Sequence, residues 1–530
     1  MFDLFFSSKE TYASLSNRGH IFGSRETPTS LKNHGNTLLN EGRISEAENL
    51  YRRAIKLDPG FMAAHYNLGN ALRIQGRFEE ALAAYETALK LAPGDYEIYM
   101  NIGATLIELG RVADALQAFS RANELMPSAA EPLVNMGLAC ERLGHIEDSP
   151  MNFEAAVEHY HKALLVKPDF AEAHNNLGLA LQSQGNFDAA VESYQKALSI
   201  NPGFADAYNN LGNVLQLQGK LDAAVENFQR ALSLKPGFAD AHYNLGNARK
   251  DLRQFAEAEA SYRNALMINP SHVKALNSLG GLQMETGHPN EALACFQQAA
   301  QLDPENGIAS HFIASITGIN PECAPSQYIV ELFDGFANEF EPSLVELNYD
   351  APEKLVTLIT GRAKPSTEKW DVLDLGCGTG LVGSAIAPYA RQLVGVDLSA
   401  GMLAKAKDKK LYQRLEKLEL LAMMKGEMAS SYDVIIAADV FIYIGRLDNV
   451  LEEIKRLLRP GGVLAFSVEA LDTLSNEDGA KNDERDYQLN HTGRYSHSSS
   501  YINRMVDTIG FKKHGLTLDN IRVEKGEPVQ

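Results

Sequence analysis

The amino-acid sequence predicts two folds in succession: an all-α superhelix of about eight helix pairs, then an α/β domain built on a parallel sheet. The superhelix is predicted because glycine, alanine and an aromatic residue recur every 34 residues through the first 306, and proline closes each unit. The α/β domain is predicted because, after residue 369, short apolar runs alternate with helix-like segments and the first run ends in three glycines. A chain of 530 residues is long enough for both.

Four segments follow from these patterns. We expect an N-terminal extension over residues 1–27, the repeat superhelix over 28–306, a capping helix and linker over 307–327, and the α/β domain over 328–530. The capping helix is expected because a terminal repeat must cover its apolar face. The linker is expected because prolines recur after residue 319.

Composition excludes several classes of partner. The formal net charge is −19, and no basic cluster is available to displace counterions from a nucleic acid. No run of about 18 apolar residues occurs, so no membrane partner is expected. The four cysteines form no CxxC pair and show no ligand spacing, which predicts neither a metal site nor a disulfide framework. The start of the chain also lacks a basic region typical of a signal peptide, so we expect a cytoplasmic protein.

The repeat positions indicate how its helices pack. An alanine follows each repeat glycine by twelve residues, and an aromatic residue follows four residues later. Small residues let two antiparallel helices approach closely, and we expect the ring to fill the groove between neighbouring pairs. Proline ends each second helix. The repeat glycines are Gly35, Gly69, Gly103, Gly137, Gly178, Gly212, Gly246 and Gly280.

The fourth unit departs from this register. Gly137 and Gly144 are in phase, but Ala156, Tyr160 and Ala163 arrive seven residues late. We expect the extra stretch to lengthen the turn between the two helices, because an insertion disturbs packing least in a turn.

Phrases such as AHYNLGNAL and AEAHNNLGLAL closely resemble the tetratricopeptide repeat. The resemblance implies a superhelix whose inner helices line a groove. Asparagines two positions before the repeat glycines would face that groove, where an amide can pair with the N–H and C=O groups of an extended peptide. A similar ladder is a feature of the repeats of O-linked N-acetylglucosamine transferases; the alternative is a polar residue tolerated on a solvated face. The asparagines are Asn33, Asn67, Asn101, Asn135, Asn176, Asn210 and Asn244.

The second half predicts a parallel sheet with helices on both faces. Two helical stretches, 328–341 and 351–360, precede an apolar strand that enters a glycine turn within 370–380. Ligands of such sheets bind beyond the carboxyl ends of the strands, where this turn lies. Further strands are predicted at 392–399, 415–420, 432–444 and 461–469.

The spacing of the turn decides between ligand classes. Gly376, Gly378 and Gly380 follow Asp374 as DxGxGxG, which is not the GxGxxG fingerprint of dinucleotide-binding folds. Asp397 ends the second strand 17 residues after Gly380. With these spacings, VLDLGCGTGLVG and VGVDLSAGML resemble class I S-adenosylmethionine-dependent methyltransferases, which have a Rossmann-like fold. The alternative is a nicotinamide-binding or catalytically silent domain of similar fold.

The resemblance implies S-adenosylmethionine as the cofactor and assigns roles to single residues. The three glycines would let the backbone approach the methionyl part, with Asp374 near its amino group and Asp397 on the ribose. Leu398 and Met402 would line the adenine. Glu419 and Leu420, at the end of the third strand, would lie beside the adenine amine. For Met402 and Leu420, ordinary core packing is the alternative.

The acceptor side is less defined. The resemblance places Asp439, after the fourth strand, at the methyl-transfer site, where a base is needed only for a protonated acceptor. Late in the chain, Arg494 could hold a carboxylate or phosphate, and Tyr495 and His497 are candidates for catalysis. The alternatives are an exposed arginine and a histidine at a helix start.

These observations predict a methyltransferase with an unidentified acceptor and a repeat groove that binds a protein or peptide. The chain is similar to bacterial predicted methyltransferases that carry tetratricopeptide repeats. The alternative is a non-catalytic interaction scaffold with a vestigial methyltransferase domain. The fold ordinarily closes with an antiparallel strand pair, and the sequence after LTLDNIRVEK gives no clear last strand.

Overall fold

The chain forms two compact units, Met1–Arg253 and Gln254–Gln530, and each is described by itself. The predicted N-terminal extension lies outside the described residues except for its last two, and the predicted boundaries at 306 and 327 stay predictions. The computed structural model describes residues 26–147, 149–334, 337, 340–347, 349–361, 369–471, 485–513, 515, 522–524 and 527–529.

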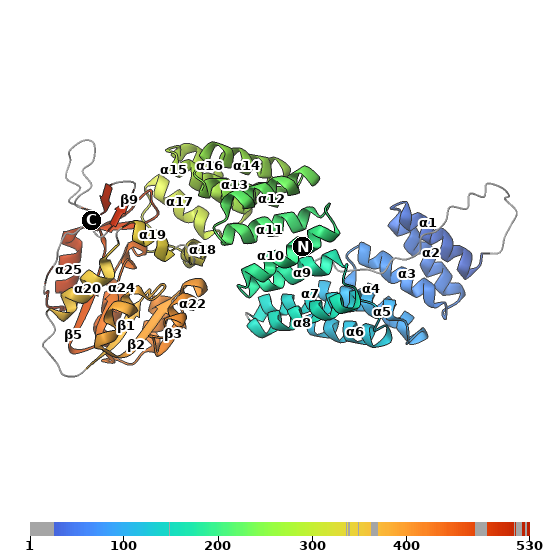
Figure 1. The fold of residues 1–530 in the computed structure, drawn as a ribbon, viewed down its shortest axis with the longest axis horizontal. Coiled ribbons are helices and arrows are strands. Elements are labelled where there is room, and N and C mark those ends of the chain that lie inside the picture. The colour runs from blue at the N-terminus through green and yellow to red at the C-terminus, as the bar shows by residue number, and fades with distance from the viewer. Residues whose placement is uncertain are drawn as a thin grey trace. The chain divides into compact units, whose positions relative to one another are not determined.

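The helices of the first unit alternate along the chain as the repeats predict and stack on their neighbours (Figure 1). Most are 13 or 14 residues long and end at a glycine turn or before a proline. They are α1 (Pro28–Asn40), α2 (Ile44–Leu57), α3 (Met62–Ile74), α4 (Phe78–Leu91), α5 (Tyr96–Glu108), α6 (Val112–Leu125), α7 (Glu131–Glu147), α8 (Pro150–Val166), α9 (Ala171–Ser183), α10 (Phe187–Ile200), α11 (Ala205–Leu217), α12 (Leu221–Leu234) and α13 (Ala239–Asp251).

Close approach within a helix pair explains the repeat glycine. A Cβ on Gly69 would lie 2.5 Å from Cε1 of Tyr85, and one on Gly280 would lie 2.8 Å from Cζ of Phe296. Both rings are fully buried. The ring therefore fills the space inside its own pair, and at Phe296 it also reaches the next helix, where it stacks on Phe312 with 5.1 Å between ring centroids.

The fourth repeat differs from the prediction. Its extra residues lengthen both helices, α7 and α8, to 17 residues each and leave the turn short. In six other repeats a turn glycine with positive φ follows the first helix, as Gly110 does at +74°, and in the seventh Arg253 takes this conformation at +59°. Gly144 instead lies within α7, and the ring of Phe153 packs against it, with Cε2 2.9 Å from the place of a Cβ. Pro150 then starts α8, since proline fits the first turn of a helix.

The second unit begins with the remaining repeat helices and continues into the α/β domain. The repeat helices are α14 (Phe255–Ile268), α15 (Val273–Glu285), α16 (Pro289–Leu302) and the predicted capping helix α17 (Gly307–Thr317). The helices of the α/β domain are α18 (Ser326–Asp334), α19 (Phe340–Glu346), α20 (Ala351–Thr360), α21 (Leu381–Ile386), α22 (Ala400–Asp408), α23 (Leu420–Gly426), α24 (Asp448–Leu457) and α25 (Ser499–Ile509), with short 3-10 turns η1 (Ala387–Tyr389) and η2 (Phe441–Tyr443).

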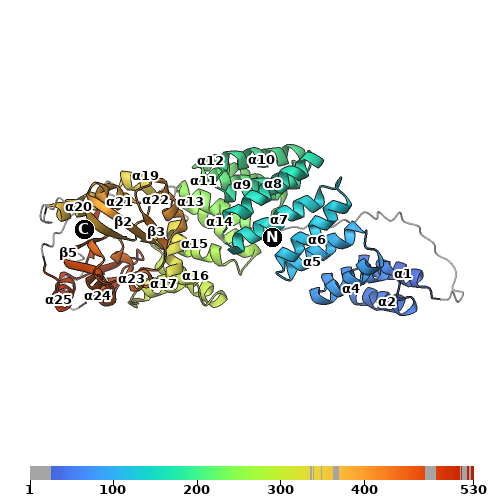
Figure 2. The same cartoon turned by 90° about the horizontal axis from the view of Figure 1, so that it is seen from below.

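A five-stranded parallel sheet in the order β3-β2-β1-β4-β5 forms the centre of this domain. Figure 2 shows α20–α22 on one face of the sheet and α23–α25 on the other. Residues of β1 alternate between the two cores: Val372 packs with Ile386 toward α21, and Leu373 packs with Ile454 toward α24. The strands are β1 (Trp370–Leu375), β2 (Ala390–Asp397), β3 (Arg414–Lys417), β4 (Tyr432–Ala437) and β5 (Leu458–Phe466).

Two of the predicted strands end earlier than expected. β3 ends at Lys417, and Glu419 instead caps α23 by accepting a hydrogen bond from the amide of Ala422. β4 ends at Ala437, two residues before Asp439, whose φ of +55° no strand can continue.

The described residues also contain an antiparallel strand pair, but it forms a separate two-stranded sheet and does not extend the five-stranded sheet. A second small sheet has the order β6-β8-β7. The short strands are β6 (Glu469–Ala470), β7 (Tyr487–Leu489), β8 (Tyr495–His497), β9 (Arg522–Glu524) and β10 (Glu527–Val529).

Candidate functional site

The carboxyl end of β1 lies at the point where the strand order of the sheet reverses, which is where ligands of such sheets bind. β2 and β4 lie on either side of β1, so the connections leaving β1 and β4 run in opposite directions. The glycine turn that follows β1 has positive φ at Gly376 (+61°), Gly378 (+53°) and Gly380 (+87°). A Cβ on Gly376 would lie 2.5 Å from Cγ2 of Val440, whereas a Cβ on Gly378 would meet no atom within 4 Å. The turn therefore has no room for a side chain at Gly376, whereas the space beside Gly378 is open.

Asp397, at the end of β2, holds the middle of this turn. Its Oδ2 accepts a hydrogen bond of 2.9 Å from the amide of Gly378, and its Oδ1 accepts one of 2.9 Å from the amide of Ser399. Burial raises the pKa of Asp397, and these amide donors oppose the shift. The carboxylate therefore joins the glycine turn to the start of α22.

Asp374, in β1, is fully buried behind the turn. Its Oδ2 accepts a hydrogen bond of 2.6 Å from the hydroxyl of Tyr412. Within the described part of the chain, its Oδ1 has no hydrogen-bond partner. Burial raises the pKa of Asp374 to about 7, the Tyr412 hydroxyl lowers it, and the charge of Asp397 raises it further. A buried acceptor without a donor is costly, so this site suits a cationic or N–H-bearing ligand.

Helices α18 and α19 approach the same edge. Asp334 Oδ1, at the end of α18, accepts hydrogen bonds from Ser399 Oγ at 2.5 Å and from the Gly401 amide at 3.1 Å. In α19, Glu341 pairs with Lys409 at 2.7 Å. These contacts attach α18 and α19 to both ends of α22, next to Asp397. Nothing in the sequence pattern marked them, because the partners lie 65 or more residues apart.

The predicted adenine residues lie around α22 and α23. Met402 is buried, 1% exposed, and belongs to the packed side of α22, which favours its alternative role as core. Leu398 is partly exposed beside Asp397, and Leu420 packs partly buried against the α24 side of the core. Glu419 is exposed and serves as the cap of α23. The adenine roles of these residues stay predictions.

Asp439 lies where β4 ends, in the left-handed region. Its amide donates to Ser467 Oγ at 2.8 Å, and that hydroxyl donates to Asp439 Oδ1 at 2.9 Å. A non-glycine residue in this conformation is uncommon and costs free energy, so the surrounding contacts must hold it. Ser467 does so from the end of the neighbouring strand β5.

The predicted catalytic pair belongs to strand β8, where the sequence analysis expected the approach to a helix. Nε2 of His497 lies 2.9 Å from the carbonyl oxygen of Ile444 and 3.0 Å from that of Gly445, so it must carry the proton and donate. Burial lowers the pKa of His497 to about 4. Tyr495 is fully buried. This geometry favours a structural role for both, and their catalytic roles stay predictions.

Arg494 does not lie free at the surface. Its Nη1 approaches Glu469 Oε1 at 3.5 Å, and about a quarter of the side chain is exposed (27%). The positive charge of Arg494, which was expected to hold the acceptor, is therefore partly neutralised by the carboxylate of Glu469 in β6.

The asparagines of the repeats do not project singly. Asn67 donates to Asn36 Oδ1 at 2.8 Å, Asn210 to Asn175 Oδ1 and Asn244 to Asn209 Oδ1 at 3.0 Å each. Each amide therefore bonds the preceding repeat. Of the other four, Asn33 is exposed, Asn176 is partly exposed and two are buried, Asn101 and Asn135. Peptide binding by this ladder stays a prediction.

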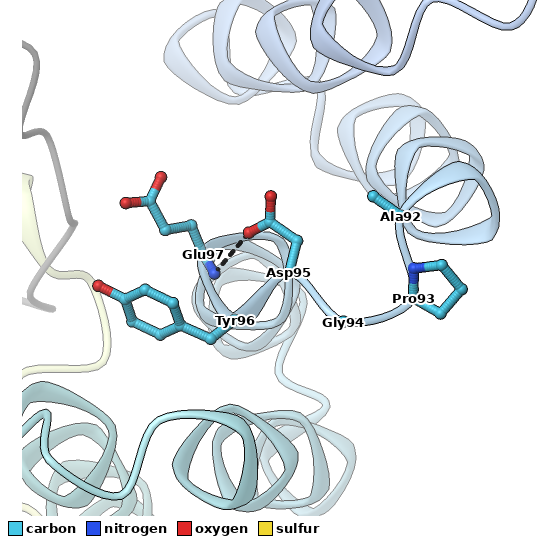
Figure 3. Close-up of a pocket in the computed structure, with 6 residues that line it drawn as sticks. All are labelled: Ala92, Pro93, Gly94, Asp95, Tyr96 and Glu97. Atoms are coloured by element: carbon cyan, nitrogen blue, oxygen red, sulfur yellow. Dashed lines mark hydrogen bonds between the residues drawn. The ribbon is translucent and has the colours of Figure 1, made fainter.

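A surface hollow in the first unit is lined by none of the residues predicted to bind cofactor, acceptor or peptide. Figure 3 shows residues 92–97, the loop between α4 and α5, lining it. Its one marked contact is the Glu97 amide donating to Asp95 Oδ1 at 3.0 Å, which caps α5.

Among the described residues, no group of three His, Cys, Asp or Glu side chains could hold a metal ion. Across the same residues, no helix has the length and apolar character to cross a bilayer.

Family models match both parts of the chain. Residues 373–464 match one described as a methyltransferase domain, and this range contains the glycine turn, Asp397 and Asp439. Residues 239–272 and 273–306 each match a tetratricopeptide repeat model. Residues 7–242 match a model described as the cilia and flagella-associated protein 70 C-terminal domain.

Individual relatives agree with the first of these matches. The chain is 30% identical over 141 residues to malonyl-(acyl-carrier protein) O-methyltransferase of Salmonella typhimurium, which is 27% of this chain and 53% of the relative. It is 29% identical over 140 residues to methyltransferase-like protein 27 of Homo sapiens, 26% of this chain and 56% of the relative. The chain thus spans about half the length of the curated relatives it matches. Among solved structures, it is similar to YrrB, a TPR protein with an unusual peptide-binding site, at 25% identity and a TM-score of 0.29, over 37% of this chain and 98% of that chain.

Proposed function

We propose that this chain, which carries tetratricopeptide repeats and a methyltransferase domain, transfers a methyl group from S-adenosylmethionine to an acceptor and binds a protein or peptide through its repeats. The observation that carries the proposal is the buried carboxylate of Asp374 behind the open glycine turn together with the partly buried carboxylate of Asp397 beside it. Asp374 keeps one oxygen without a donor, and Asp397 is fixed by the Gly378 amide.

This donor set fits S-adenosylmethionine. The free oxygen of Asp374 suits an ammonium group, and the carboxylate of Asp397 suits the paired hydroxyls of a ribose. The open space at Gly378 suits the close approach of backbone to ligand that only glycine allows. The cofactor would supply a methyl group already activated on a sulfonium.

The residues of this chain would then align and shield the reaction. Methyl transfer from a sulfonium needs chiefly an in-line approach, so positioning supplies most of the rate. Asp439, held by Ser467 at the carboxyl end of β4, would face the acceptor. Asp334 and Glu341 would keep α18 and α19 against α22, which would limit water at the cofactor edge.

The acceptor class that we favour is a group carried on a protein. The repeats support this choice, since stacked helix pairs commonly present an extended binding surface. The names of several relatives also point to an acceptor on a carrier protein. A free metabolite is the alternative acceptor.

Calorimetric titration of S-adenosylhomocysteine into the full chain tests the cofactor proposal. We expect micromolar binding, about −8 kcal/mol, and loss of measurable binding in Asp397→Ala. Asp408→Ala is the matched control, because that exposed acid lies at the far end of α22. No heat with a folded wild-type protein would contradict the proposal and favour the alternative, a non-catalytic scaffold.

A further inference from the structure

Tyr412 occupies a central place in the candidate site that neither the motif nor the comparisons assign. It lies in the loop between α22 and β3 and donates its hydroxyl proton to Oδ2 of Asp374 at 2.6 Å. The two residues are 38 positions apart in the chain. The hydroxyl thus serves one oxygen of a buried carboxylate whose other oxygen has no donor in the described part of the chain.

The ring of Tyr412 also lies against three glycines on three different elements and leaves no room for a side chain at Gly383. A Cβ on Gly380 would lie 3.1 Å from its Cε2, one on Gly383 of α21 would lie 2.5 Å from its Cζ, and one on Gly395 of β2 would lie 2.8 Å from its Cε1. Distances below 3.0 Å leave no room for a methyl group. The glycine turn, the helix after it and the second strand are therefore packed around one ring.

The charged groups near this contact are few. The charge of Asp397 raises the pKa of Asp374, the charge of Asp334 raises the pKa of Asp397, and the Tyr412 hydroxyl is the group that favours the charged form of Asp374. A donor to one oxygen fixes the rotation of the carboxyl group and leaves the other oxygen directed elsewhere. Tyr412 thus controls both the charge and the orientation of Asp374.

We propose that Tyr412 is a positioning residue of the cofactor site: its ring holds the glycine turn in shape, and its hydroxyl binds Oδ2 of Asp374 and so directs Oδ1 toward the ammonium group of the ligand. This inference rests on the proposed function and adds a residue to it. Tyr412 acts through Asp374 and the turn, so it is not itself a catalytic residue.

The pH dependence of ligand binding tests this role. We would titrate S-adenosylhomocysteine into the full chain from pH 6.0 to 8.5, for wild type and Tyr412→Phe. An ammonium ligand binds the charged carboxylate, so wild-type affinity should fall about tenfold over this range toward acid, because the pKa of Asp374 is raised to about 7. Tyr412→Phe should move the midpoint up by about one pH unit, since a hydrogen bond to a charged group is lost.

The size of the defect should then depend on pH. Near pH 7 we expect Tyr412→Phe to bind about fivefold more weakly than wild type, and at pH 8.5 the two should nearly converge. Tyr432→Phe is the matched control, because that buried hydroxyl bonds Glu427 at the opposite end of the sheet. A Tyr412→Phe defect of equal size at every pH, or none, would overturn the inference.

A second variant keeps the test decisive if Tyr412→Phe does not fold. Asp374→Asn keeps an acceptor for the Tyr412 hydroxyl and cannot ionise, so its affinity should be weak and independent of pH. Retention of the wild-type pH dependence in Asp374→Asn would overturn the inference while leaving cofactor binding intact. A wild-type protein that binds no ligand would overturn the proposed function, and this inference with it.

Discussion

Nε2 of His311 donates a hydrogen bond of 2.8 Å to the carbonyl oxygen of Gly493, 182 residues further along the chain. His311 belongs to α17, the helix after the last repeat, and Gly493 to the turn between β7 and β8. Two neighbouring bonds hold the same turn: Ser315 Oγ donates to the Asn490 carbonyl, and the Leu489 amide donates to Asn320 Oδ1, each at 2.8 Å. The segment expected as a cap and linker is thus bonded into the methyltransferase domain.

This bond predicts that His311 stabilises the second unit. His311→Leu should lower the free energy of unfolding of that unit by about 1–3 kcal/mol, because the Gly493 carbonyl loses its buried donor. Urea unfolding of the full chain, followed by a probe in the α/β domain, would measure it. His491→Leu, an exposed histidine in the same turn, is the control and should change stability by less than about 0.5 kcal/mol. Equal effects of the two variants would contradict the role of this bond.

Periodic features of the fold were predictable from the sequence, and single long-range contacts were not. The register of the repeats was readable because each glycine and its ring meet inside one helix pair, 16 residues apart, as Gly69 and Tyr85 do. The central strands were readable because apolar runs alternate with helices, and Asp374 and Asp397 because they end such runs. Tyr412 and His311 were missed because their partners lie 38 and 182 residues away and follow no period.

Errors arose where a local contact overrode the pattern. The insertion in the fourth repeat was expected in the turn, yet α7 runs on to Glu147 and Gly144 lies inside it, packed against the ring of Phe153. The fourth strand was expected to continue to residue 444, yet Ser467 holds Asp439 at positive φ and ends it. In both cases the deciding side chain is not visible from propensity.

Glu141 of α7 predicts an unusual pH dependence for the first unit. It is buried, 3% exposed, accepts a hydrogen bond from Tyr160 at 3.1 Å, and burial raises its pKa to about 8. A raised acid pKa means that the folded state binds the proton more tightly, so stability falls as pH rises from about 4.5 to 8. Glu141→Gln should abolish this loss and stabilise the unit by about 2–5 kcal/mol at pH 8.5.

The next repeat shows that glutamine fits this place, because Tyr194 donates to Gln182 Oε1 at 3.1 Å. Urea unfolding at pH 5 and 8.5 would compare Glu141→Gln with wild type and with Glu154→Gln, an exposed acid on α8. A wild-type stability that rises over this interval, or a Glu141→Gln variant that is weaker at pH 8.5, would contradict the argument.

The amide of Asn210 predicts a contribution to coupling between repeats. Asn210→Ala should lower the stability of the first unit by about 1 kcal/mol, because Asn175 Oδ1 loses its donor from the neighbouring repeat at 3.0 Å. Asn33→Ala, at an exposed position of the same register, should cost less than about 0.5 kcal/mol. Thermal unfolding of the two variants beside wild type would measure the difference, and an Asn33→Ala cost as large as that of Asn210→Ala would contradict it.

The packing of Gly383 against Tyr412 predicts opposite effects for two glycine-to-alanine changes. Alanine ordinarily stabilises a helix by up to about 1 kcal/mol relative to glycine. At Gly426, the last residue of α23, an added Cβ meets nothing within 4 Å, so Gly426→Ala should be neutral or stabilising. At Gly383 the same Cβ would lie 2.5 Å from Cζ of Tyr412, so overpacking should outweigh propensity and cost about 1–3 kcal/mol. Urea unfolding decides the sign: two variants of equal stability would mean that the ring can yield, and the glycine turn would then not depend on Tyr412 for its shape.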